Sequence, residues 1–294
     1  MKLVVSGDSW TFGSELRDPN VDFTKIKEWD IENEKYRLSH IWPNKLAEML
    51  NIEEVINLSW PSSSNDYIVR TTINWLMEKY ISKKLPVDDV FIIIGFTNFS
   101  RRDFFYDGPK RSYWRTIWPN TEYDYVDENI NEFVDLYERN FQTPVDDMNR
   151  HLNQLHYLEL FLKKYKINYL LFQAFHENRG HAIEKWDDVV YDGLLGYEDD
   201  WKYHGAFKIR DILRWKEIDP IRFVDKDKTV HSFHNRIMKI GEKRNVPDVF
   251  ANVLRMHPNE IGHLLWAEYL FDYINEHEIM DTLNYDKQKK TNLI

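Results

Sequence analysis

The sequence of 294 residues contains no cysteine, which excludes disulfide bonds and thiolate metal sites. Basic residues are outnumbered: 39 Lys and Arg against 49 Asp and Glu give a formal net charge of −10 at pH 7. A surface of this sign repels nucleic-acid phosphates, so we expect no nucleic-acid partner. No apolar run approaches the ~20 residues that span a bilayer, so we expect no membrane partner either.

Other signatures are missing as well. The sequence has no glycine-rich phosphate loop and no dinucleotide-binding fingerprint. Its 11 histidines stand in no recognised ligand motif, so we predict neither a metal nor a cofactor. Met1 leads directly into an apolar segment, without the basic region and cleavable stretch of a secretory signal. We therefore expect a cytoplasmic protein.

Apolar runs and helical periodicity alternate along the chain, which predicts a parallel sheet with helices on both faces. We expect strands at 2–6, 55–58, 90–94 and 167–172, and helices at 41–50, 65–82, 128–165 (interrupted at Pro144), 229–243 and 260–277. Residues 18–40 are charged, and we expect them to be irregular. In the last helix, five residues have a spacing that predicts inward packing: Ile261, Leu264, Leu265, Tyr269 and Ile274.

No linker divides the chain, so we predict a single domain over residues 1–280 and a polar C-terminal tail over 281–294. Aromatic residues make up 15% of the chain. They are frequent at about 100–126 and 176–225, which we interpret as two insertions near the carboxyl ends of the strands.

The first strand is followed at once by Gly7, Asp8 and Ser9. This order puts a serine hydroxyl at the carboxyl end of a strand, where open α/β sheets build their sites. Near the other end of the chain, His257 precedes Pro258 and the last helix. A histidine is the usual base that activates a serine hydroxyl.

Together these two segments resemble the SGNH (GDSL-like) hydrolase family. The resemblance implies a three-layer α/β/α, flavodoxin-like fold of about five parallel strands, with Ser9 as nucleophile and His257 as base. It also implies an oxyanion hole made by the backbone N–H groups of Ser9 and Ser62 and the side-chain amide of Asn98, with Thr97 in reserve. His263, beyond the histidine motif, is expected to be structural.

The chain departs from the family pattern at two of these positions. Ser62 stands where the family has a glycine; a serine keeps the N–H donor but fits poorly in a backbone conformation that glycine favours. Asn98 comes one residue later than the family's asparagine, and Thr97 holds that place.

Three neighbours of these blocks are candidate substrate contacts. They are Asp8, Trp10 and Arg101. For Asp8 the alternative is that it caps the following helix, and for Arg101 that it is simply solvated.

The family's aspartate, three residues before the histidine, is replaced here by Leu254. Three accounts remain open. A backbone carbonyl orients the imidazole, or an acid comes from elsewhere, with Asp248 nearest in sequence, or the site is weakened or inactive as a hydrolase.

The leading interpretation is a serine ester hydrolase that removes a small acyl group, such as acetyl, from a small-molecule or glycan ester. One alternative is an O-acyltransferase that uses the same acyl-enzyme. The other is a non-catalytic SGNH-fold binding or structural protein, encoded by a phage and associated with its virion.

Overall fold

The computed structural model describes residues 1–107, 112–117, 128–142, 144–174, 217–225, 232–251 and 257–280. Its main sheet has four parallel strands in the order β2-β1-β3-β6. They are β1 (Lys2–Ser6), β2 (Glu54–Asn57), β3 (Val90–Phe96) and β6 (Asn168–Gln173). This is the strand order of flavodoxin-like folds, in which the chain reverses direction next to β1.

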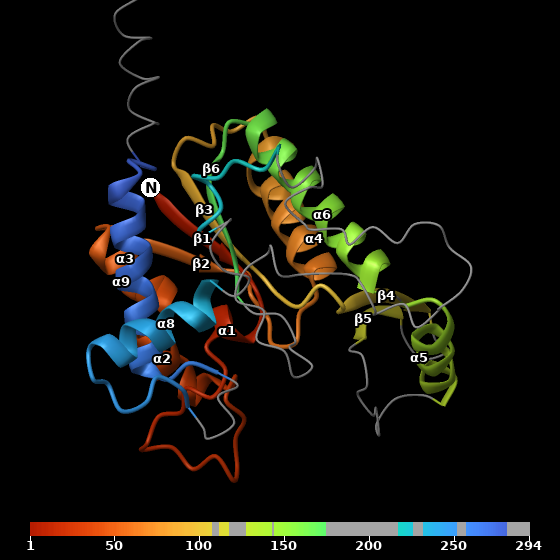
Figure 1. The fold of residues 1–294 in the computed structure, drawn as a ribbon, viewed down its shortest axis with the longest axis horizontal. Helices are drawn as coiled ribbons and strands as arrows, with labels where there is room; N and C mark the ends of the chain where they lie inside the picture. The colour runs from red at the N-terminus through yellow and green to blue at the C-terminus, as the bar shows by residue number, and fades with distance from the viewer. Residues whose placement is uncertain are drawn as a thin grey trace, which may run out of the picture.

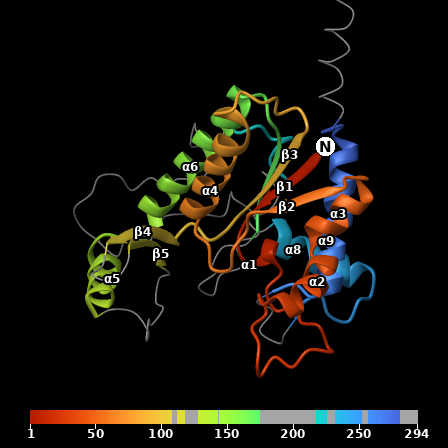
Figure 2. The same ribbon diagram turned by 180° about the vertical axis from the view of Figure 1, so that it is seen from behind.

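The helices are α1 (Ser9–Phe12), α2 (Ile31–His40), α3 (Trp42–Met49), α4 (Asn65–Leu76) with a π-helical turn η1 (Met77–Ile81), α5 (Glu128–Asn140), α6 (Pro144–Lys164), α8 (Ser232–Lys243) and α9 (Glu260–Glu276). Helices α3, α8 and α9 lie on one face of the sheet, and α4 and α6 lie on the other (Figure 1). The view from behind shows the same three layers (Figure 2). The predicted α/β/α fold is confirmed.

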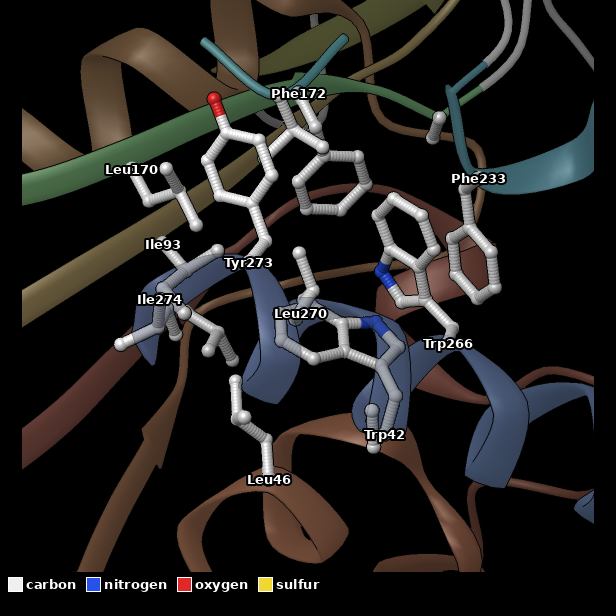
Figure 3. Close-up of a cluster of buried hydrophobic side chains, with 14 of the residues drawn as sticks. Trp42, Leu46, Ile93, Leu170, Phe172, Phe233, Trp266, Leu270, Tyr273 and Ile274 are labelled. Atoms are coloured by element: carbon white, nitrogen blue, oxygen red, sulfur yellow. The ribbon is translucent and has the colours of Figure 1, made fainter. Parts of the chain in front are cut away.

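Alternate residues of the buried strands face the two helix layers, as the twofold repeat of a strand requires. Ile93 packs into the cluster with α3, α8 and α9, whereas Ile92 packs into the cluster with α4 and α6. In the first cluster the rings of Phe233 and Trp266 stack 4.7 Å apart (Figure 3). This double core holds the sheet rigid, and the sheet in turn fixes the ends of its strands.

One further residue pairs with the sheet beyond its four strands. Phe223 forms a single parallel bridge with Leu171 at the outer side of β6. Two residues later, Asp225 has a left-handed backbone (φ 55°), a conformation that does not continue a β-strand. The described residues thus contain four parallel strands and one bridge, in keeping with the predicted sheet of about five strands.

The first predicted insertion contains an antiparallel ribbon of β4 (Arg102–Asp107) and β5 (Ser112–Ile117). The carboxylate of Asp103, almost wholly buried, fastens this ribbon to α4. It accepts hydrogen bonds from Ser64 Oγ (2.6 Å), Arg70 Nη2 (2.7 Å) and Thr116 Oγ1 (2.7 Å). Most of the second insertion, residues 175–216, lies outside the described residues.

Two sequence predictions about helices are wrong. Residues 31–40 form α2, although 18–40 were expected to be irregular. The buried residues of α2 are the polar Asn33 and Arg37, so the helix has no apolar stripe. In α9, Ile261 and Leu264 are exposed rather than packed inward, because that face of the helix turns away from the core. The break at Pro144 is confirmed, since α6 begins there.

Among the described helices, none combines the length and the apolar character needed to cross a membrane.

The start of α9 depends on a close backbone approach at Gly262. A Cβ at this position would lie 2.3 Å from the carbonyl oxygen of Val249. We expect Gly262→Ala to lower the free energy of unfolding by about 2 kcal/mol, because backbone has to move to relieve the clash. Urea denaturation measures this loss.

Gly241→Ala is the matched control. A Cβ there would face the same residue, but its side chain, with Val249 Cγ1 at 2.8 Å. The side chain can shift, and alanine gains roughly 1 kcal/mol over glycine inside a helix. Equal losses in the two variants would contradict the backbone explanation.

Candidate active site at the carboxyl edge of the sheet

Ser9 is the first residue of α1, shortly after the end of β1, and it is almost wholly buried. Asp8 caps this short helix by accepting the backbone N–H of Trp10 (3.0 Å). The helix ends at Gly13, which has a left-handed conformation (φ 87°) and donates its N–H to the carbonyl of Ser9 (2.9 Å). The Gly-Asp-Ser segment thus forms one tight turn that presents Ser9 at the edge of the sheet.

Two glycines let this turn sit directly on the ends of β1 and β3. A Cβ on Gly7 would lie 2.3 Å from Thr11 Oγ1, and one on Gly95 would lie 3.2 Å from the same atom. The side chain of Thr11 fills the space that these two missing side chains leave. The nucleophile segment and the β3 loop are therefore held in direct contact.

The buried carboxylate of Asp8 joins this turn to the loop after β3. Its Oδ2 accepts a hydrogen bond from Thr97 Oγ1 (2.5 Å) and lies 3.4 Å from Arg101 Nη1. Arg101 Nη1 also donates to the carbonyl of Ser63 (3.2 Å), in the loop after β2. Loops that follow three neighbouring strands are thereby tied together through buried charge.

This arrangement bears on the three candidate substrate contacts. Asp8 and Arg101 are buried and bonded to one another. Trp10 is also buried, with its ring against Phe233 and Phe250. All three residues hold the site together from within and offer little surface to a substrate.

Ser62 has a left-handed backbone with φ 70°. This is the conformation that the family's glycine would adopt readily, and a serine adopts it at a cost. The same loop is anchored to the nucleophile turn, because Asn57 Nδ2 donates to the carbonyl of Thr11 (3.2 Å) and Trp60 N–H donates to that of Gly7 (3.4 Å). Ser62 therefore adopts a backbone conformation that glycine favours.

Asn98 is buried in the loop after β3. Its Oδ1 accepts hydrogen bonds from the backbone N–H and the hydroxyl of Ser100, each at 2.8 Å. These bonds fix which end of the amide is the donor. Thr97, the reserve candidate, is braced on both sides by Asn65, which accepts its N–H (2.9 Å) and donates to its carbonyl (3.1 Å).

His257 reaches the site from the other end of the chain. Its carbonyl accepts a hydrogen bond from the N–H of Ala251 (2.9 Å). The next residue, Pro258, forms an isolated antiparallel β-bridge with Phe250. The ring of Phe250 lies 6.2 Å from that of Trp10, beside the nucleophile. Packing thus brings the segment of His257 against the segment of Ser9.

A second contact joins the same two segments. Nδ1 of His257 lies 3.2 Å from Oε2 of Glu15, six residues after the candidate nucleophile. Asp248, the nearest acid that precedes His257 in sequence, accepts the N–H of Phe250 (3.0 Å). Leu254 lies outside the described residues. Sequence reasoning missed Glu15, because nothing in the local pattern separates it from the other surface acids.

Two further histidines are structural. His263, expected to be structural, is wholly buried, and its Nδ1 accepts the N–H of Trp42 (3.3 Å). Burial lowers the pKa of His263 to about 3, so its ring is neutral at physiological pH. Burial also lowers the pKa of His151 to about 3, and Nδ1 of this ring lies 3.1 Å from Nδ2 of Asn65.

In the part of the chain that the structure describes, no three His, Asp or Glu side chains gather as a metal site would require.

Trp60 is 52% exposed beside Ser62, and no local sequence pattern singles it out. Its ring packs edge-on against Phe12 of α1, with ring centroids 5.8 Å apart. An exposed indole in this place provides a flat apolar surface next to the candidate nucleophile.

A family model described as a family of unknown function (DUF6071) matches residues 22–188. Three solved structures are similar to the chain. One, from Parabacteroides merdae, is named as a GDSL-like lipase (14% identity, TM-score 0.41, 95% of each chain covered). Another, from Desulfitobacterium hafniense, is named as a lipolytic protein of the G-D-S-L family (13% identity, TM-score 0.34, 92% of this chain and 98% of that one).

The third, from Bacteroides fragilis, is named as an acylhydrolase (10% identity, TM-score 0.32, 96% of this chain and 88% of that one). At these identities and TM-scores the three likenesses carry no information on activity. No curated protein matches the chain at a significant level.

The buried pair of Asp8 and Arg101 is open to a direct test. Asp8→Asn keeps an oxygen that can cap α1 but removes the charge facing Arg101, so the free energy of unfolding should fall by roughly 3 kcal/mol. Glu54→Gln is the control, because it removes the negative charge from an exposed ion pair, that of Lys2 and Glu54. That loss should stay below about 1 kcal/mol. Equal losses in chemical denaturation would show that the Asp8 pair is not a structural tie.

The left-handed backbone of Ser62 yields another prediction. Ser62→Gly should be at least as stable as the natural chain and keep whatever activity it has, because glycine accepts this conformation and retains the N–H. Ser62→Val should lose roughly 1–3 kcal/mol, since a β-branched residue is strained there. Thermal unfolding of both variants measures the difference. A folded Ser62→Gly without activity would show that the side chain, and not the backbone N–H, matters.

Proposed function

The chain belongs to the DUF6071 family, whose function is unknown, and we propose that it is a serine ester hydrolase of the SGNH type. The observation that carries this proposal is the contact of 3.2 Å between His257 and Glu15. It places the candidate base against the loop that directly follows the candidate nucleophile's helix. The two segments come from opposite ends of the chain, and chemistry between Ser9 and His257 requires that they meet.

In the proposed reaction, Ser9 Oγ attacks the acyl carbonyl while the imidazole of His257 takes the hydroxyl proton. The carbonyl oxygen becomes an oxyanion, and the same proton then passes to the leaving alcohol as the ester bond breaks. Water, activated by His257, hydrolyses the acyl-enzyme and restores Ser9. Neither step needs a cofactor.

Three donors are proposed for the oxyanion: the backbone N–H groups of Ser9 and Ser62 and the amide of Asn98. Their support comes from local geometry. The φ of Ser62 lies in the left-handed region that glycine favours. The oxygen of the Asn98 amide accepts hydrogen bonds from Ser100, which leaves the NH₂ group as the end that can donate. Each donor of this kind typically contributes 10²–10³ in rate.

The substrate class that we propose is a small acyl ester, such as an acetyl ester on a carbohydrate. Trp60 supports a sugar on the alcohol side, because an exposed indole face beside Ser62 can stack on the apolar face of a sugar ring. The same acyl-enzyme would support O-acyl transfer if an acceptor alcohol outcompetes water. Product analysis with an added acceptor separates these two outcomes.

The proposal predicts that a fluorophosphonate probe labels the natural protein at Ser9 and that p-nitrophenyl acetate is hydrolysed. Ser9→Ala should abolish labelling and lower kcat at least ~10³-fold, because the acyl-enzyme cannot form. Ser14→Ala is the matched control, since this buried serine lies in the same segment and its hydroxyl has no hydrogen-bond partner among the described residues. It should retain both properties. Absence of labelling at Ser9 in the natural protein, with no turnover, would overturn the proposal.

A further inference from the structure

We propose that Glu15 is the positioning residue for His257, in place of the aspartate that the motif lacks. This inference rests on the proposed function and names the acid that the sequence around His257 does not supply. Among the described residues near His257 in sequence, none has its side chain within ion-pair distance of the ring, and the loop that follows the nucleophile's own helix provides the acid.

The first observation is the environment of His257 Nδ1. This atom is buried, and it forms no aligned hydrogen bond within the described residues. Glu15 Oε2 lies 3.2 Å away and is the one charged group within ion-pair distance of the ring in that part of the chain. The side chains of His257 and Glu15 are 17% and 28% exposed, so water screens the pair only in part. In unliganded enzymes such bonds are often poorly aligned and tighten when substrate binds.

The second observation is how firmly the backbone presents Glu15. Its φ is 70°, a left-handed conformation that a glutamate adopts at a cost. Its N–H donates to Glu28 Oε2 (2.7 Å), and the carbonyl of Glu28 accepts the amide of Asn33 (2.8 Å). On either side, Gly13 takes a left-handed turn and Leu16 is buried. The loop is therefore fixed at both ends, and its strain is located at the residue whose carboxylate meets His257.

The rival acid has another role. Asp248 Oδ1 accepts the N–H of Phe250, and the carbonyls of both residues accept the amide of Asn259 (3.2 and 3.3 Å). Asn259 in turn caps α9 by accepting the N–H of Gly262 (2.9 Å). Asp248 therefore shapes the turn before His257, and its carboxylate is engaged there.

The consequence for the reaction is a defined tautomer. With Nδ1–H donated to the Glu15 carboxylate, Nε2 carries the lone pair that accepts the proton of Ser9. When that proton arrives, the imidazolium is paired with the ionised carboxylate, which itself takes no proton. Without Glu15, the ring is free to turn or to carry its proton on Nε2, where it cannot act as the base.

The test compares Glu15→Gln, Glu15→Asn and Glu15→Asp with the natural protein. Glutamine removes the charge at nearly constant size, and asparagine tolerates the left-handed backbone, so at least one neutral variant should fold. For the folded neutral variants we expect kcat for p-nitrophenyl acetate to fall about 10²–10⁴-fold with KM little changed. Glu15→Asp should recover part of that loss, because it restores a carboxylate.

Histidine ¹⁵N NMR supplies a readout that a purely structural role would not move. In the natural protein His257 should be the Nδ1–H tautomer, and in Glu15→Gln the Nε2–H form should increase. Asp248→Asn is the matched control, because asparagine still offers an oxygen to the Phe250 N–H. It should leave the His257 tautomer unchanged and alter kcat by no more than about 3-fold. A tautomer shift in Asp248→Asn, or an unchanged kcat and tautomer in folded Glu15→Gln, would overturn the assignment.

The two proposals fail in different ways. If Ser9 of the natural protein is not labelled by the fluorophosphonate, the hydrolase proposal fails, while the His257 tautomer still reports the pairing with Glu15. If Ser9 is labelled and the folded neutral Glu15 variants turn over at the natural rate, the hydrolase proposal stands and the role of Glu15 is refuted.

Discussion

The buried carboxylate of Asp8 is the interaction on which the site depends. One oxygen caps the helix that begins at Ser9. The other accepts a hydrogen bond from the hydroxyl of Thr97 and forms an ion pair with Arg101. Because Arg101 also binds the carbonyl of Ser63, one charge pair holds together the loops after three adjacent strands. A parallel sheet brings such loops to one edge, but only specific bonds fix their distances. Here that task falls to an ion pair with little access to water.

Backbone strain marks the same region. Ser62 and Glu15 both have φ 70°, and neither is a glycine. Strained residues of this kind cost about 1–3 kcal/mol each and persist where the surrounding structure over-determines them. The double core on the two faces of the sheet offsets such a cost. At both positions the strained residue provides a group for the proposed chemistry: an N–H at Ser62 and a carboxylate at Glu15.

The fold could be predicted where burial follows apolar pattern. The strands β1, β3 and β6 are apolar runs, and Pro144 marks the start of α6 as expected. Prediction failed where buried groups are polar. Helix α2 buries Asn33 and Arg37, and Arg37 is stabilised by the carbonyl and ring of Phe12, contacts that no periodicity signals.

Local sequence is enough to place Ser9 after the first strand and His257 before the cap of the last helix, because neighbouring residues set strand ends and helix caps. The same local pattern left the acid open, with Asp248 as the nearest choice before His257. Long-range packing engages Asp248 in a turn and brings Glu15 to face His257. This contact joins residues from opposite ends of the chain and is created by the packing of α1 against the segment before α9, which no local pattern encodes.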